Sequence, residues 1–335
     1  MTIRRALGAF LCGAVAGTIG FTAVASAVTI DVRDPLAVAT VAARQHAYDG
    51  TLTVTWRADG VLRTRTVEVH SDAGRVAVTG DRVLSAAGVR RSLRSGGVWH
   101  LLWNRADSSA APAVDAKYTV TTEPGVLVAG RPTDRVRITD PQGNVRELID
   151  LDRETGLLLR REQRNEQGAV MRITGFEEVS IAAAPSDGPP AAVGPNTPKG
   201  AGPSPVRITA PFVSVTRLPG GFVRVGAYRA ADAGREQYFT DGLVGVSVFE
   251  WSGSLKPGSL PAGGSYGSAG RPDARIYESP VGQVVVWDAG GRTYTVVSEA
   301  TPVETARIVA SLPKDGTDDV PTRVGRFLIG PFTWR

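Results

Sequence analysis

The segment Tyr238-Phe-Thr-Asp-Gly-Leu-Val-Gly-Val-Ser-Val-Phe249 carries an Asp-Gly-Leu step before a strand-like apolar run. After a loop, Gly282-Gln-Val-Val-Val-Trp-Asp and Tyr294-Thr-Val-Val-Ser-Glu repeat this β-branched composition, which is typical of strands. Thr301-Pro-Val-Glu304 then forms a capping-box pattern with proline in the first turn, and Ala306-Arg-Ile-Val-Ala-Ser-Leu312 follows it. This order predicts a small β-sheet that ends in one helix.

The N-terminal half also begins with a clear signal for its local structure. Asp34-Pro35 suits a helix start, and apolar spacing continues to about Ala47. From Thr51 to Trp56 polar and apolar residues alternate, which predicts a strand with one buried face. Ala58-Asp59-Gly60 predicts a hairpin turn, and alternation resumes after it.

Short strands with regular turn signals continue beyond this hairpin. The further predicted strands are Arg75–Val78, Val98–Trp103, Tyr118–Thr122, Asp134–Thr139, Val145–Asp150, Leu157–Gln163 and Ala169–Ile181. Few helices interrupt them, which disfavours a parallel α/β sheet. The predicted fold class is therefore mainly antiparallel β, of the α+β type.

The chain divides into two predicted folding units. A segment rich in proline, glycine and alanine, residues 182–205, cannot bury enough apolar surface to order itself and is expected to be a linker. The first unit spans residues 34–181, the second spans 206–312, and residues 313–335 form a tail.

Residues 1–27 have the features of an export signal. Arg4 and Arg5 precede an apolar run, and Ala25-Ser26-Ala27 is a small-x-small cleavage site. The alternative is an uncleaved anchor, because the apolar stretch approaches the ~20 residues that span a bilayer. Both alternatives place the protein outside the cytoplasm, in the periplasm or on the outer face of the cytoplasmic membrane. The only cysteine, Cys12, lies inside this segment.

Charge and site chemistry argue against several classes of protein. The formal charge of +5 is mild and is spread among acidic residues, whereas a nucleic-acid-binding protein concentrates its positive charge. The three histidines, at positions 46, 70 and 100, lack the spacing of a metal site, and no serine lies in a nucleophile elbow. Asp150, Asp152 and Glu154 fit turn chemistry better than an acid/base pair. We therefore expect no enzymatic activity, no metal and no cofactor.

Several short motifs, in order along the chain, resemble the MucB/RseB family. They are His46-Ala-Tyr-Asp-Gly-Thr-Leu52, Val128-Ala-Gly-Arg-Pro132, Ile149-Asp-Leu-Asp-Arg-Glu-Thr-Gly-Leu-Leu-Leu-Arg160, Leu218-Pro-Gly-Gly-Phe222 and the Asp-Gly-Leu segment. The family's Gly-Glu-Val-Pro motif before the last helix is replaced here by Ser298-Glu-Ala-Thr-Pro302, and the linker is long.

The resemblance implies a fold and a function. The first domain would be a half-open, curved β-sheet plugged by a helix, as in the lipoprotein carriers LolA and LolB, and the second a smaller sheet with one helix. The protein would bind the outer domain of a membrane anti-sigma factor, protect it from proteolysis and release it when a lipid or lipoprotein binds. The alternative is a lipid or lipoprotein carrier of the cell envelope.

Two groups of residues follow as candidate sites. An apolar ligand pocket, which competes with an ordinary sheet core, would use Leu52, Val54, Trp56, Trp99, Leu101 and Trp103. Since the resemblance assigns much of the partner contact to the second domain, the candidate contact residues are Asp241, Gly242, Leu243 and Phe249.

Overall fold

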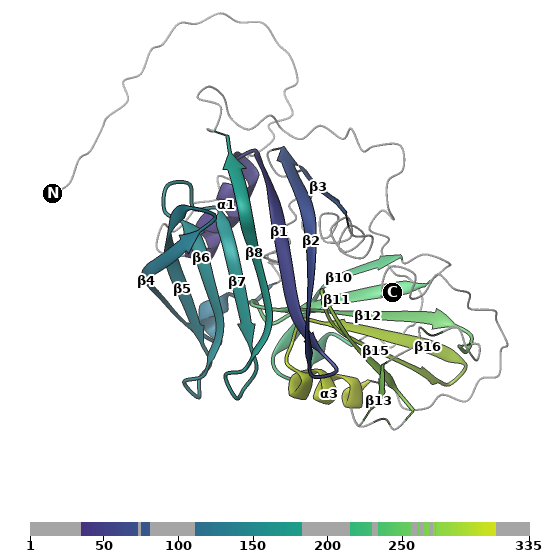
Figure 1. Cartoon of the computed structure of the whole chain (residues 1–335). Helices are drawn as coiled ribbons and strands as arrows, with labels where there is room; N and C mark the ends of the chain where they lie inside the picture. Colours follow the sequence, from purple (N-terminus) through teal and green to yellow (C-terminus); the bar gives the residue numbers. More distant parts are fainter. Residues whose placement is uncertain are drawn as a thin grey trace, which may run out of the picture.

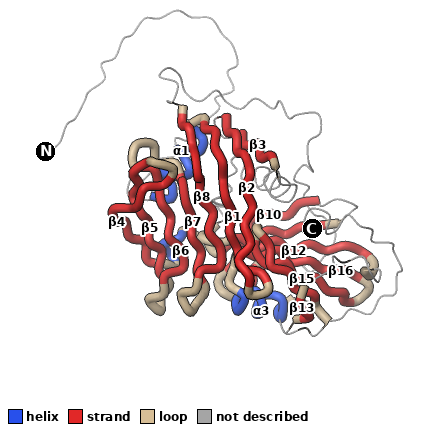
Figure 2. The backbone as a smooth tube through the Cα atoms, viewed as in Figure 1, coloured by secondary structure: helices blue, strands red, loops and turns tan. Residues whose placement is uncertain are grey.

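Two antiparallel sheets dominate the protein in a computed structural model. The structure describes residues 35–72, 75–80, 111–182, 215–229, 234–255, 260, 264–267, 271 and 273–312. One sheet stands upright in Figure 1, and the second lies across its lower end. Figure 2 shows how little of the described chain is helical, so the predicted fold class is confirmed.

The first sheet has eight strands in the order β3-β2-β1-β8-β7-β6-β5-β4 and does not close on itself. Its strands are β1 (Tyr48–Ala58), β2 (Val61–Asp72), β3 (Arg75–Thr79), β4 (Thr119–Val128), β5 (Arg131–Thr139), β6 (Val145–Asp152), β7 (Leu158–Arg164) and β8 (Val170–Ile181). A short 3₁₀ helix, η1 (Val114–Ala116), precedes β4. The chain returns through β8 to pair with β1, so the first and last of the sheet's strands along the chain lie side by side.

The helix α1 (Pro35–Gln45) packs against the turn between β6 and β7. Gly156 in this turn has a φ of 74°, and a Cβ atom there would lie 2.7 Å from Val38 Cγ1. The turn therefore needs glycine for its conformation and for its contact with the helix. Asp152 accepts a hydrogen bond from the amide of Thr155, which caps the same turn.

The predicted hairpin at Ala58-Asp59-Gly60 is confirmed. Asp59 and Gly60 have φ angles of 52° and 76°, and Ala58 pairs with Val61 across them. Two central residues with positive φ make this a type I′ turn, whose twist matches that of the flanking strands.

The second sheet also has eight strands, in the order β13-β14-β15-β16-β12-β11-β10-β9. They are β9 (Arg217–Leu218), β10 (Phe222–Arg229), β11 (Arg235–Thr240), β12 (Gly245–Ser252), β13 (Ser265–Tyr266), β14 (Arg275–Ser279), β15 (Gly282–Ala289) and β16 (Arg292–Ser298). Phe239, Val246, Val285 and Val296 are fully buried between the strands and α3 (Pro302–Ser311). The valine-rich sequence is therefore the core of this sheet, as its composition predicts.

The capping box at the start of α3 is confirmed, and it leads to a stability prediction. The Thr301 hydroxyl accepts from the Glu304 amide at 3.2 Å, and the Glu304 carboxylate accepts from the Thr301 amide at 3.2 Å. We expect Thr301→Ala to lower the free energy of unfolding by about 1 kcal/mol. Urea denaturation measures this change. Thr301→Ser keeps the hydroxyl and serves as control, and an equal loss in both variants would contradict the assignment.

Some predicted boundaries were wrong. The strand predicted to end at Thr122 continues to Val128, because a register shift between Pro124 and Leu127 accommodates the proline. The predicted strand Val98–Trp103, the segment 1–27 and the tail 313–335 lie outside the described residues. The domain and linker boundaries stay predictions.

Candidate functional site

Of the predicted partner-contact residues, Asp241 and Gly242 lie where the second sheet meets the chain that leads into the first sheet. Asp241, Gly242 and Leu243 occupy the turn between β11 and β12, and Phe249 lies within β12. All four are buried, and the side chain of Asp241 is 1% exposed. In this structure they contact the rest of the chain, and their role toward another protein stays a prediction.

Asp241 shapes its own turn with one carboxylate oxygen. Its Oδ1 accepts from the amides of Leu243 and Val244, each at 3.0 Å. Gly242 has a φ of 97°, and a Cβ atom there would lie 2.6 Å from the carbonyl oxygen of Pro112. Glycine is needed here because the chain leading into η1 passes directly against the turn.

The other carboxylate oxygen of Asp241 reaches the first domain. Its Oδ2 accepts from Lys117 Nζ at 2.6 Å and from the Tyr118 hydroxyl at 2.5 Å. Burial raises the pKa of Tyr118 far above its ordinary value, and the negative charge of Asp241 raises it further. Tyr118 therefore stays a neutral hydrogen-bond donor to a charged acceptor, which is a strong type of contact.

A second polar contact between the domains centres on Arg161 of β7. Arg161 donates to Glu147 from Nε at 2.8 Å and from Nη2 at 2.5 Å, and its Nη1 lies 3.9 Å from Glu299 Oε2 of the second domain. Burial acts to lower the pKa of Arg161, but the two carboxylates outweigh it and raise the pKa. A charged guanidinium thus joins an acidic residue from each domain.

Further bonds continue the contact around α3 and β14. Arg146 Nη2 donates to Glu304 Oε2 at 2.7 Å, and the Thr301 hydroxyl bonds to Glu166. Arg172 Nη1 donates to the carbonyl of Pro280 at 3.1 Å. These contacts join residues more than 100 positions apart, so the junction is built by tertiary structure and not by local sequence.

A cleft of about 290 Å³ opens beside these bonds. Its first-domain lining comes from the ends of β1 and β8 and from two turns, and its second-domain lining from the β14–β15 turn and the start of α3. The lining includes Trp56, Arg57, Asp59, Arg172, Glu278 and Gln283. The indole nitrogen of Trp56 is buried and makes no hydrogen bond within the described part of the chain.

The predicted apolar pocket is only partly described. Leu52, Val54 and Trp56 lie along β1 on its buried face, 0%, 1% and 5% exposed, inside the core. Trp99, Leu101 and Trp103 lie outside the described residues. Within the described part, Leu52 and Val54 pack as core, while Trp56 also lines the cleft. An apolar ligand site here stays a prediction.

Sequence reasoning missed the residues that join the domains from the first-domain side, Lys117, Tyr118, Arg146 and Arg161. The only local signal is the run of charged residues in Leu158-Leu-Arg-Arg-Glu-Gln-Arg164, where a half-buried strand would be expected to alternate. Buried charges are almost always paired, so such a run predicts partners without identifying them.

Metal sites and membrane-spanning helices can be judged for the described residues. These residues contain no group of three or more histidine, cysteine, aspartate or glutamate side chains placed to hold a metal ion. Among the helices of the described segments, none is long and apolar enough to cross a membrane.

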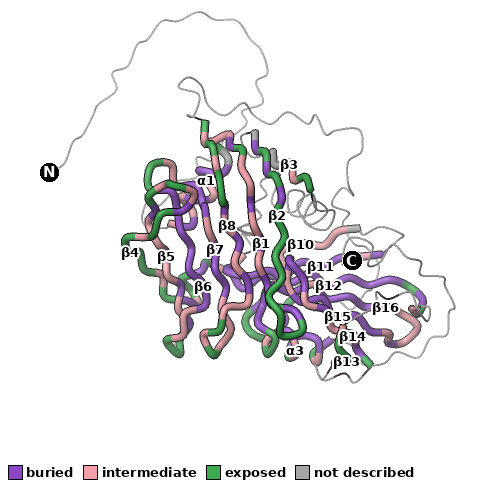
Figure 3. Tube along the Cα trace, in the orientation of Figure 1, coloured by how far each residue is buried: buried purple, intermediate pink, exposed green. Residues whose placement is uncertain are grey.

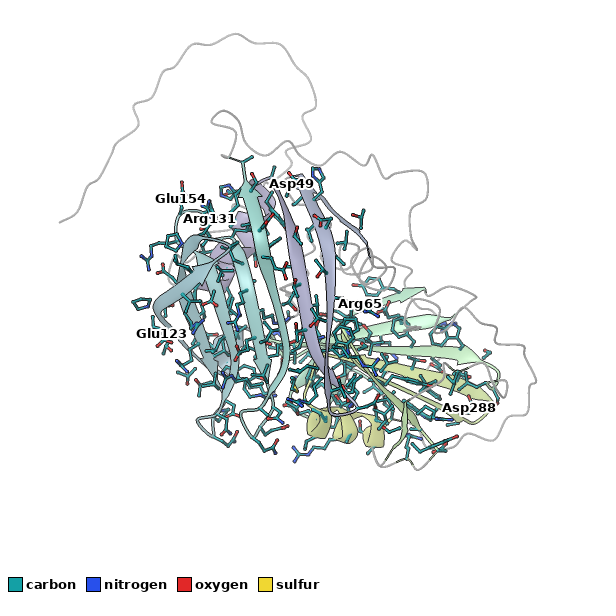
Figure 4. The ribbon with its side chains drawn as sticks, in the orientation of Figure 1. Asp49, Arg65, Glu123, Arg131, Glu154 and Asp288 are labelled. Atoms are coloured by element: carbon teal, nitrogen blue, oxygen red, sulfur yellow. The ribbon has the colours of Figure 1, made fainter. Side chains whose placement is uncertain are left out.

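A cluster of Arg131 with two carboxylates at one end of the first sheet makes stability depend on pH. Arg131 donates to Asp152 from Nε at 2.7 Å and from Nη2 at 3.1 Å, and it also reaches Glu154 at 2.9 Å (Figure 4). Burial acts to raise the pKa of Asp152, but the bonds from Arg131 and Thr155 outweigh it, so the pKa lies below its ordinary value.

A lowered folded-state pKa means that Asp152 stabilises the protein above its ordinary pKa and that this stabilisation is lost as the pH falls through the folded pKa. We expect the free energy of unfolding to fall less steeply from about pH 5 to about pH 3 in Asp152→Asn than in the unmodified protein. Urea denaturation across this range measures the slopes. Glu154→Gln, which removes an exposed carboxylate, is the control, and equal slopes for all three proteins would contradict the prediction.

Comparison with known proteins gives a likeness in structure. No family model matches the chain. No curated protein matches it either. The chain is similar to MucB. A crystal structure of MucB in complex with the periplasmic part of MucA is 20% identical, with 86% of this chain and all of that chain covered and a TM-score of 0.47.

Two other solved structures belong with this comparison. The MucA/MucB complex of Pseudomonas aeruginosa is 22% identical, with the same coverage and TM-score. A LolA superfamily protein from Nitrosomonas europaea is 8% identical, with 79% of this chain and 91% of that chain covered and a TM-score of 0.18. At these sequence identities and TM-scores, the similarity does not establish a function.

Proposed function

We propose that this protein is a non-enzymatic, extracytoplasmic negative regulator of an alternative sigma factor. It binds the outer domain of a membrane anti-sigma factor and shields that domain from proteolysis. MucB has been solved in complex with the periplasmic part of MucA, and we propose a partner of the same kind here. The observation that carries the proposal is the ordered set of MucB/RseB-like motifs, which extends from His46 to the Asp-Gly-Leu step at Asp241.

The arrangement of the domains supports a regulator that can change shape. A ligand releases a partner only if the ligand and the partner favour different arrangements of the protein. The two sheets meet through charged and polar side chains, such as Lys117 with Asp241 and Arg146 with Glu304. Polar groups of this kind can exchange their partners for water or for polar groups of a ligand when the sheets move apart. We propose that a lipid or lipoprotein supplies the release signal.

Affinity capture tests the proposed partner. The tagged full-length protein is recovered from gently solubilised native membranes, and the bound proteins and lipids are identified by mass spectrometry. We expect a single-span membrane protein with a cytoplasmic sigma-binding domain to be recovered at a stoichiometric level. Recovery of lipids or lipoproteins without such a protein would contradict the proposal and favour a carrier.

A further inference from the structure

The first sheet has two edges with different properties. On one side, β4 is interrupted by Pro124 and Gly125, and its pairing with β5 shifts register there. Proline and bulges on an edge strand hinder the addition of another strand. On the other side, β3 covers only the stretch of β2 from Glu68 to Asp72. The remainder of β2 contains no proline, glycine or register shift.

This uncovered part, residues 61–66, is exposed on both of its faces. All six residues are exposed, and Val61 and Leu62 are each 61% exposed. Figure 3 shows the same stretch of β2 as a continuous exposed segment. No strand pairs with its outer side within the described part of the chain. We call residues 61–66 the open edge.

The backbone of the open edge is set by the hairpin turn beside it. In a two-residue hairpin the two residues that flank the turn, here Ala58 and Val61, form backbone hydrogen bonds to each other. Such hydrogen-bonded pairs then alternate with non-bonded pairs along the two strands. The amide and carbonyl groups of Leu62, Thr64 and Thr66 therefore face away from β1. Side-chain contacts agree with this register, because the hydroxyls of Thr55 and Thr64 lie 3.1 Å apart, as expected for a closely spaced non-bonded pair.

The side chains around the open edge are mainly basic. Arg57, Arg63 and Arg65 lie along this stretch and its turn together with Asp59, whose contact with Arg63 is a 3.5 Å pair between exposed side chains. Glu278 of β14 lines the cleft beside Asp59. Arg63 and Arg65 lie opposite Trp56 and Val54 and so share one face of the sheet (Figure 4 labels Arg65). An added strand would place every second side chain over this basic face.

We propose that the open edge binds an extended, acidic polypeptide segment by strand addition. Backbone groups of Leu62 and Thr64 would bond the segment, while Gly80 lies beside the carbonyl of Thr66 and marks the end of the accessible stretch. Acidic side chains at alternate positions would meet the basic face. This inference rests on the proposed function for the source of the segment, the outer part of the anti-sigma factor. Strand addition draws affinity from the main chain and specificity from alternate side chains.

A peptide of defined sequence tests the open edge. The probe is a dye-labelled ten-residue peptide of alternating threonine and glutamate, and its binding to the full-length protein is followed by fluorescence anisotropy. Thr64→Pro removes an outward amide and should weaken binding at least about tenfold. Thr64→Ala removes the same hydroxyl but keeps the amide, so it should bind like the unmodified protein. Equal affinities for the two variants, or no binding to the unmodified protein, would overturn the proposal.

Charge reversal provides a test that does not alter the backbone. Arg63→Glu should weaken binding of the glutamate peptide about tenfold, and added salt should narrow this difference. Arg153→Glu, a reversal at an exposed site on the β6–β7 turn, should leave binding unchanged. A peptide of alternating threonine and lysine should not bind the unmodified protein. Equal binding of both peptides would overturn the assignment of an acidic segment.

Two further outcomes separate this inference from the proposed function. If Thr64→Pro still captures the anti-sigma factor as well as the unmodified protein, the open edge is not its site, although the proposed function stands. If sedimentation shows a dimer that Thr64→Pro abolishes, a second copy of the chain occupies the edge and the proposal is wrong. Loss of capture in Thr64→Pro, with capture kept in Thr64→Ala, is the result that we expect.

Discussion

Replacing Arg161 by methionine should lower the free energy of unfolding by about 3–5 kcal/mol. The guanidinium is buried between two carboxylates. Its Nη2 lies 2.5 Å from Glu147 Oε1, and its Nη1 lies 3.9 Å from Glu299 Oε2. Methionine fills similar volume but leaves both carboxylates buried without their cation, and an uncompensated buried charge is strongly destabilising. Urea denaturation followed by tryptophan fluorescence measures the loss.

Two comparisons isolate the cause of this effect. Arg153→Met breaks the 3.0 Å pair with Asp134 between exposed side chains, and it should cost about 0.5 kcal/mol or less. The double variant Glu147→Leu and Arg161→Met removes one of the stranded carboxylates, so it should be more stable than Arg161→Met alone. A double variant that is less stable than the single variant would show that packing, and not charge, dominates at Arg161.

Asp241→Asn should separate the turn from the contact between the domains. Asparagine keeps an oxygen to accept from the amides of Leu243 and Val244, but its amide nitrogen would face Lys117 Nζ and the Tyr118 hydroxyl, which both donate to Asp241. We expect a loss of about 2–3 kcal/mol in the free energy of unfolding, because the charge-assisted bonds are lost in a buried position.

Hydrogen exchange distinguishes the two roles of Asp241. In Asp241→Asn the amides of Leu243 and Val244 should stay protected, whereas amides next to Lys117 should exchange faster as the domains part more often. Asp241→Ala should lose protection at both places. If Asp241→Asn leaves exchange near Lys117 unchanged, the aspartate does not hold the domains together.

Local structure could be predicted wherever a short pattern determines it. The hairpin at Asp59-Gly60 and the capping box at Thr301 and Glu304 both follow from residue types within four positions, and the structure confirms both. The strand ending at Thr122 was predicted too short because proline normally ends a strand, whereas a register shift before Leu127 carries this edge strand past Pro124.

The contacts between the domains could not be predicted in the same way. Lys117 and Asp241 are 124 positions apart, and nothing near either residue in the sequence identifies the other. Asp150 shows the same limit: the sequence predicts a turn residue, but Asp150 lies in β6 and accepts from Arg135 Nε at 2.8 Å and from Arg160 Nη1 at 3.3 Å on the neighbouring strands. The register of β6 decides these partners, and it shifts next to Asp150 and between Ile138 and Thr139, which simple alternation along the sequence does not predict.

We propose that this protein restrains a sigma factor from outside the cytoplasmic membrane. The most direct test is to delete its gene and measure the transcriptome against the parent strain. We expect one sigma-dependent set of transcripts to rise and to return to the parental level when the unmodified gene is restored. If no sigma-dependent set changes on deletion, under resting conditions or under envelope stress, the account is wrong.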